Sequence, residues 1–331
     1  MLTHLQTLGL LLEHERIEPN HLDWAELRRV ATAEGVIVRL SDALTACGEA
    51  LPPRFGNAAA DACGAAQREL EIVNRLGARC TALGMPHAFL RTVENHPDGS
   101  RGRITLLVGV SAAHTPGIDR TILRDVPAAE RHGGATLERR IAGVSAYVAV
   151  YGIRVHIRHG RIGRLGEHAR YARLLLERAR PVVAGHVACR APSVEDHLLL
   201  LAIDRAYMRP AFRLADLAWT IPVLRTQGLN WDYIFATALS IGMLPGVGTF
   251  LAYVNGIHRQ IFARDVVDTT VVQRFQGFPA SATTQFPAAG AIARTYAHNV
   301  EATLESGRWH SVARLALLPF IAALARTRRS L

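Results

Sequence analysis

The chain has 331 residues, of which 49% are hydrophobic and 20% charged, so it can bury a sizeable core in one large or two ordinary domains and is neither disordered nor collagen-like. All 38 basic residues are arginine and the formal net charge is +10. This balance is typical of surfaces that bind nucleic acids or other anions, with the coding bias of a GC-rich genome as the alternative explanation. The absence of lysine excludes a P-loop and any enzyme that forms a Schiff base through a lysine.

The N-terminal segment, residues 1–84, is predicted to be helical because its apolar residues recur at helical spacing. A long helix is expected after Pro52-Pro53, and Gly84 is the signal that ends it. One face of this long helix carries the apolar series Leu70, Val73, Leu76, Cys80 and Leu83.

The central segment, residues 85–165, is predicted to form a small sheet. The run Arg103–Val108 is β-rich and lies between two glycines, which is typical of a strand. Two further β-rich runs, 144–150 and 153–157, flank Tyr151-Gly152 and predict a hairpin or a bent pair of strands. The remaining expected elements are a short strand at 87–91 and a helix over 115–131.

Helices return in the third segment, residues 166–275. Ser193 is the expected N-cap of one helix, because acidic residues follow it in the first turn. The last segment, 276–331, is predicted to be a linker followed by a helical tail. The whole layout predicts an α+β fold with a small mixed sheet between an N-terminal and a C-terminal helical segment. Further helices are expected at 170–180, 214–221 and 231–239.

The cysteines and histidines favour neither disulfides nor a zinc site. The four cysteines have no C-x-x-C spacing, which is typical of a reduced, cytoplasmic protein. His156 and His159 are three residues apart on a predicted strand, so their side chains should point to opposite faces of the sheet. We expect no signal peptide, because the start has no basic region before its apolar residues, and no transmembrane helix, because no apolar stretch reaches about 18 residues.

Three short segments of the central part carry a recognisable pattern: Ala88–Thr92 reads AFLRT, Gly102–Val108 reads GRITLLV and Arg154–Ile157 reads RVHI. Their order and surroundings resemble those of bacterial nucleotidyltransferase-family proteins with a reduced polymerase-β-type core, over roughly residues 5–245. In that family the corresponding segments are a strand that ends in Lys-Gly, then Gly-Asp-Ile-Asp-Leu-Leu-Val, then Glu-Leu-His-Trp. The matching helical pieces are Leu22–Trp24, Pro192–Leu200, Arg213–Ala218 and Asn230–Asp232.

The acidic positions implied by this resemblance are all replaced. In the family, two acids alternate on one strand, a third lies on a neighbouring strand, and together they bind Mg²⁺; here these positions hold Arg103, Thr105 and Arg154. A guanidinium keeps its charge and cannot ligate a cation. We therefore expect no catalytic residue, no metal site and no cofactor, and Mg²⁺ only if other carboxylates converge. The acids nearest to these positions in the sequence are Glu94, Asp98 and Asp119.

The candidate site is a binding site for a nucleotide or another phosphorylated ligand. Arginine binds phosphate through paired hydrogen bonds, so Arg103 and Arg154 are candidates for replacing the metal charge with fixed charge; the alternative is a decayed site whose arginines reach solvent. His156 matches a residue that the family retains and is either a ligand contact or a packing residue. The full candidate set is Arg91, Arg103, Thr105, Arg154 and His156.

The resulting hypothesis is a nucleotidyltransferase-like pseudoenzyme that acts as a nucleotide- or anion-binding accessory or scaffold protein. One alternative is an active nucleotidyltransferase that moves a nucleoside monophosphate onto a small molecule, sugar or protein. Another is an arginine-rich nucleic-acid-binding module, for which the basic stretch Arg158–Arg164 is the candidate. The C-terminal helix Leu315–Leu324, with flanking arginines, is expected to dock on the domain or on a protein partner, or to lie on an anionic membrane.

Overall fold

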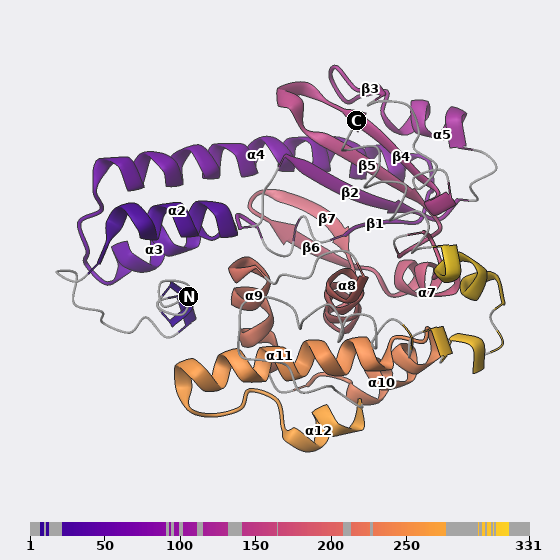
Figure 1. The fold of residues 1–331 in the computed structure, drawn as a ribbon. Coiled ribbons are helices and arrows are strands. Elements are labelled where there is room, and N and C mark those ends of the chain that lie inside the picture. The colour runs from indigo at the N-terminus through magenta and orange to yellow at the C-terminus, as the bar shows by residue number, and fades with distance from the viewer. Residues whose placement is uncertain are drawn as a thin grey trace, which may run out of the picture.

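The protein is an α+β structure in which helices from both ends of the chain surround a five-stranded mixed sheet and a separate two-stranded hairpin (Figure 1). The computed structural model describes residues 7–9, 11–12, 22–90, 93, 96–98, 102–110, 115–131, 141–163, 165–207, 213–225, 228–275, 297, 300–301, 303–305, 307 and 309–317. None of the helices in these ranges is long and apolar enough to cross a bilayer.

The N-terminal part consists of α2 (Trp24–Glu34), α3 (Ile37–Ala46) and the long α4 (Pro53–Ala82). Asp23 caps α2, because its carboxylate accepts hydrogen bonds from the backbone N–H groups of the first turn. Gly35 ends the same helix in the left-handed conformation, with a φ of 75°, which a glycine adopts without strain. The long helix predicted after Pro52-Pro53 is confirmed as α4, which has a proline in its first turn.

The main sheet has the strand order β1-β2-β5-β4-β3. β2 and β5 run parallel to each other, and every other neighbouring pair is antiparallel. The tight turn η3 (Val150–Gly152) joins β4 to β5, so the hairpin predicted around Tyr151-Gly152 is confirmed. The strands are β1 (His87–Phe89), β2 (Arg103–Val108), β3 (Glu130–Arg131), β4 (Val144–Val148) and β5 (Arg154–His159), and α5 (Thr115–Ile122) lies between β2 and β3 in the chain.

The two faces of this sheet have different surroundings because successive side chains of a strand point to opposite sides. On one face, Ile104 and Leu106 of β2 and Val155 of β5 are fully buried in a core shared with α4 and α5. On the other face, Leu107 belongs to the larger core formed by the N-terminal and C-terminal helices. The strand ends near Arg103 and Arg154 are only partly covered on this second face.

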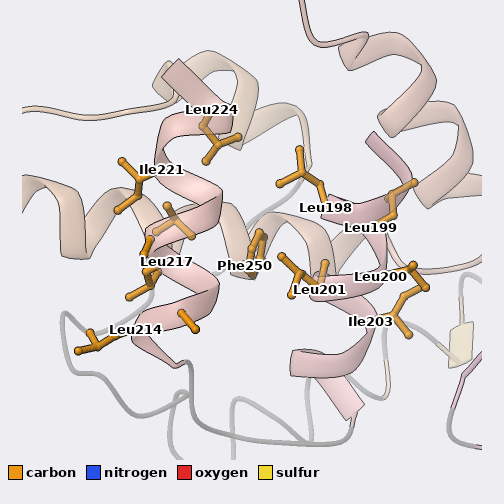
Figure 2. Packing of buried hydrophobic residues seen from close by; sticks show 14 of the residues in the cluster. Leu198, Leu199, Leu200, Leu201, Ile203, Leu214, Leu217, Ile221, Leu224 and Phe250 are labelled. Atoms are coloured by element: carbon orange, nitrogen blue, oxygen red, sulfur yellow. The ribbon is translucent and has the colours of Figure 1, made fainter. Parts of the chain in front are cut away.

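The C-terminal part contains a hairpin followed by a helical layer that lies below the sheet in Figure 1. Residues 198–203 of α8 are buried all round, which is typical of a helix enclosed by others, and Phe250 of α11 lies between the leucines of α8 and α9 (Figure 2). The elements are α7 (Ala169–Arg178), β6 (Arg180–Ala184), β7 (Val187–Ala191), α8 (Val194–Tyr207), α9 (Leu214–Arg225), α10 (Trp231–Ser240), α11 (Leu244–Phe262) and α12 (Thr269–Arg274).

Several expected elements differ from the structure. The helix predicted over 115–131 ends at Ile122, and β3 forms at its far end. Pro127 cannot donate a backbone hydrogen bond, and Ala128 adopts a φ of 52°, so a helix that continued past Ile122 could not run through residues 127–128. The sequence did not predict the β6–β7 hairpin or α11, since α11 is buried on nearly every side and begins with a proline and two glycines. The predicted linker 276–290 lies outside the described residues.

Candidate functional site

Four of the five candidate residues are neighbours on one face of the main sheet. In the parallel pairing of β2 with β5, Arg103 lies opposite Arg154, and Thr105 lies opposite His156. Residues two apart on a strand share a face, and strands are spaced about 4.8 Å apart, so these four residues form a compact block. We call this block the arginine face. Arg91, the fifth candidate, lies outside the described residues.

The arginine face is open to solvent at the ends where β2 and β5 begin. Arg154 is exposed, whereas Arg103, Thr105 and His156 are half-buried. The Arg154 side chain makes no hydrogen bond or ion pair with any residue that the structure describes. The cross-strand neighbours of Arg154 and His156 on β4 are Val148 and Ala146, which carry no charge. Positive charge on this face is therefore not neutralised by its β4 neighbours.

The backbone below Arg103 is held in place by Glu69 of α4. The Glu69 side chain is buried, and its carboxylate accepts hydrogen bonds from the backbone N–H groups of Gly102 and Arg103. The N–H of Arg154 in turn donates to the carbonyl of Gly102, at 2.7 Å. These bonds fix the start of β2 against β5, so the spacing of Arg103 and Arg154 is set by the fold and not by the flexible side chains alone.

Arg158 shares this face but has a structural role. Its guanidinium donates to the carbonyl of Gly163 at 2.8 Å and thereby holds the loop that follows β5. Burial lowers the pKa of Arg158, while the nearby carboxylates of Asp204 and Glu167 act in the opposite direction. Their place near Arg158 was not predicted from the sequence, because Asp204 lies on α8 and Glu167 in the loop before α7. The positive charge of Arg158, which belongs to the predicted basic stretch, is therefore offset by two nearby carboxylates.

Two of the three acids nearest to the replaced positions, Asp98 and Asp119, have partners other than Arg103 and Arg154. Asp98 is buried and pairs with Arg39 of α3, whose Nε is 2.7 Å from the carboxylate. Asp119 pairs with His159 at 3.1 Å, and His159 lies on the opposite face of the sheet from His156, as predicted. Glu94 lies outside the described residues. Among the residues that are described, no group of three or more His, Cys, Asp or Glu side chains is arranged to hold a metal ion.

These residues do not fit the Mg²⁺ that the resemblance implies. Mg²⁺ takes oxygen ligands in a tight octahedral arrangement, usually with one or two carboxylates. Two guanidinium groups flank the place where such carboxylates would stand, and their charge opposes cation binding. The site is instead suited to an anion, which guanidinium groups bind through charge-assisted hydrogen bonds.

The chain was also compared with known proteins. No family model matches it, and neither the curated proteins nor the solved structures contain a match.

The acidic pair Glu195-Asp196 is structural, as its position at the start of α8 suggested. Ser193 caps this helix, since its hydroxyl accepts the N–H of Asp196 at 3.2 Å. The buried Asp196 carboxylate accepts hydrogen bonds from the hydroxyls of Ser193, at 2.8 Å, and Tyr233, at 2.6 Å. The guanidinium of Arg178 lies against both Asp196 and the Tyr233 ring. This cluster joins α7, α8 and α10 and offers no open site.

Proposed function

We propose that this protein binds a nucleotide or another phosphorylated ligand through the arginine face and acts as a nucleotidyltransferase-like accessory or scaffold protein without metal-dependent transfer. The observation that carries the proposal is the direct pairing of Arg103 with Arg154 on adjacent parallel strands. A phosphate group takes up two or more guanidinium hydrogen bonds at once, and such bonds are about twice as strong as neutral ones.

The charges on these strands give a reason for a ligand. The backbones of Arg103 and Arg154 lie directly opposite each other on β2 and β5. An anion that contacts both guanidinium groups accepts charge-assisted hydrogen bonds from each. Thr105 and His156, the next pair along the same strands, add hydroxyl and imidazole groups that hydrogen-bond to phosphate or ribose oxygens. The ligand is therefore expected to extend along β2 and β5 from the exposed end.

The direct test is a calorimetric titration of the full chain with ATP, CTP, GTP and UTP, each with Mg²⁺ and each with EDTA. Binding that persists in EDTA supports the proposal, because the fixed arginine charge does not require a cation. Binding that depends on Mg²⁺ and is accompanied by pyrophosphate release would show an active nucleotidyltransferase and overturn it.

A pair of charge-matched variants makes the test specific to the site. Arg154→Gln removes an exposed guanidinium from the arginine face, and Arg120→Gln removes an exposed guanidinium from α5, which packs on the opposite face of the sheet. Loss of a charged hydrogen bond costs about 1.5–3 kcal/mol, so Arg154→Gln should weaken binding roughly tenfold to a hundredfold. Equal weakening by both variants would indicate a diffuse attraction to the net charge and contradict a built site.

A further inference from the structure

The turn that joins β4 to β5 presents an exposed aromatic side chain close to the arginine face. Tyr151 is 68% exposed and lies three residues before Arg154, with which β5 begins. Three residues of chain span at most about 11 Å, so the Tyr151 backbone is near the exposed end of the arginine face. An aromatic ring is therefore available at the end of the sheet where we expect a ligand to bind.

The backbone of this turn favours residues other than tyrosine. Tyr151 and Gly152 have φ values of 62° and 70°, and the N–H of Ile153 donates to the carbonyl of Val150 at 3.4 Å. This is the pattern of a type I′ turn, in which asparagine, aspartate or glycine is preferred at the first central position. Tyrosine adopts this left-handed conformation less readily, because its Cβ lies close to the following carbonyl oxygen. Since neither the turn nor the core needs the exposed ring, its presence indicates a functional role.

The Tyr151 ring contacts Arg68 of α4. The guanidinium carbon of Arg68 is 5.4 Å from the ring centroid, which is the geometry of a cation–π contact. The next residue of α4, Glu69, accepts hydrogen bonds from the N–H groups of Gly102 and Arg103 and so fixes α4 to the start of β2. One turn of α4 therefore contacts both the tyrosine ring and the strand that carries Arg103.

We propose that Tyr151 stacks on the base of a nucleotide whose phosphates bind Arg103 and Arg154. This inference rests on the function proposed above and assigns the ligand class of the same site, a nucleoside diphosphate or triphosphate. The open part of the tyrosine ring is a π surface that a nucleobase covers, and all four bases have a π face that can stack on it. Arg68 adds a further positive charge at this end of the sheet.

A single stacking residue favours a free nucleotide over a nucleic-acid strand. Proteins that bind single strands place successive bases on several aromatic side chains along a basic groove. Tyr147, the nearest tyrosine in the sequence, is half-buried and donates its hydroxyl to Asp119 on the other face of the sheet. The charge of Arg158, further along β5, is offset by carboxylates. Neither Tyr147 nor Arg158 is therefore available to extend the site along a strand.

The test compares ATP with inorganic tripolyphosphate by calorimetric titration of the full chain in EDTA. Stacking of a base contributes about fivefold to a hundredfold in affinity, so Tyr151→Asn should weaken ATP binding by that factor. The same variant should bind tripolyphosphate as the unaltered chain does, because tripolyphosphate has no base. Asparagine is preferred at this position of a type I′ turn, so the variant should remain folded. Tyr151→Phe keeps the ring and should restore the affinity for ATP.

Trp309→Asn is the matched control, because Trp309 is also an exposed aromatic residue, at 70%. It lies on the helix 309–317, which packs through the buried Leu315 against Leu165, beyond the far end of β5. The expected docking of the C-terminal helix on the domain is thus met at Leu315, and residues 318–324 lie outside the described residues. Trp309→Asn should leave the affinity for ATP unchanged.

The outcomes separate this inference from the function on which it rests. If Arg154→Gln weakens ATP and tripolyphosphate but Tyr151→Asn weakens neither, or weakens both equally, the stacking role is overturned and the arginine face stands. If neither molecule binds, or if Arg154→Gln changes neither affinity, the arginine face is overturned and this inference with it. A single-stranded DNA oligonucleotide that binds more tightly than ATP, and loses this binding in Tyr151→Asn, would overturn the assignment to a free nucleotide.

Discussion

The buried carboxyl of Asp98 is expected to make the stability of the protein depend on pH. This residue lies in the turn before β2, where 1% of its side chain is exposed, and its partner is Arg39 of α3. Burial raises the pKa of Asp98 from its ordinary 3.8 to about 6, although Arg39 acts in the opposite direction. The folded protein therefore binds this proton more tightly than the unfolded chain does.

The size of the effect follows from the pKa values of Asp98 in the folded protein and in the unfolded chain. At about 1.36 kcal/mol per pH unit, the difference between these pKa values corresponds to about 3 kcal/mol in the free energy of unfolding. Because the folded value is the higher one, this contribution is fully present below about pH 4 and is lost as the pH rises through about 6. Asp98→Asn removes the titrating group and keeps a side chain of the same shape, so it should remove this part of the pH dependence.

The assay is urea denaturation of the unaltered chain and of Asp98→Asn between pH 4 and pH 8. The difference between the two free energies of unfolding isolates Asp98, because all other carboxylates titrate in both proteins. The unaltered chain should lose up to about 3 kcal/mol relative to the variant across this range. A difference that stays constant with pH, or one that grows in favour of the unaltered chain as the pH rises, would refute the reasoning.

Three further substitutions test buried hydrogen bonds and core packing elsewhere in the protein. Tyr147→Phe removes the hydroxyl that donates to Asp119 at 2.7 Å and should lower the free energy of unfolding by about 1.5–3 kcal/mol at neutral pH. Burial opposes ionisation of Asp119, but hydrogen bonds from His159, Ser145 and Tyr147 hold the pKa of Asp119 below its ordinary value. The loss of stability in Tyr147→Phe should therefore become smaller under acid conditions, where Asp119 is protonated. A loss of stability that is the same at every pH would contradict this role of the Asp119 carboxylate. Asp196→Ala leaves the hydroxyl and guanidinium groups around it without their acceptor and should cost about 2–4 kcal/mol in urea denaturation, so a cost within experimental error would rule out a structural role for the cluster. Leu201→Ala leaves a cavity between α8 and its neighbours and should cost about 2–5 kcal/mol by calorimetry; an unchanged melting temperature would mean that the core in Figure 2 is not closely packed.

The elements that the sequence predicted well are those set by local pattern. The strand 103–108 alternates partly and fully buried positions over its first four residues, and Tyr151-Gly152 marks the turn between β4 and β5. Ser193 predicts the start of α8, because an N-cap residue bonds to backbone groups within the first turn of its own helix. The helix α11 was missed because burial on nearly all sides removes the alternation that a prediction depends on. The hairpin β6–β7 is exposed along most of β6 and alternates buried and exposed positions along β7, so it was missed for a different reason: both strands are five residues long and contain proline or alanine, which have little strand preference.

The candidate site likewise has some features that are set by the sequence and others that are set only by the tertiary structure. The residue types at 103, 105, 154 and 156, and the absence of lysine, follow from the sequence alone, and they already disfavour metal chemistry. Only the tertiary structure decides that β2 pairs in parallel with β5, because about fifty residues separate the two strands and no local signal specifies their register. That register sets Arg103 against Arg154, directs His159 to the far side with Asp119, and leaves Arg158 near Asp204 of α8 and Glu167 of the loop before α7. The chemistry of a side chain depends on the residue type alone, whereas the groups that the side chain contacts depend on how the whole chain packs.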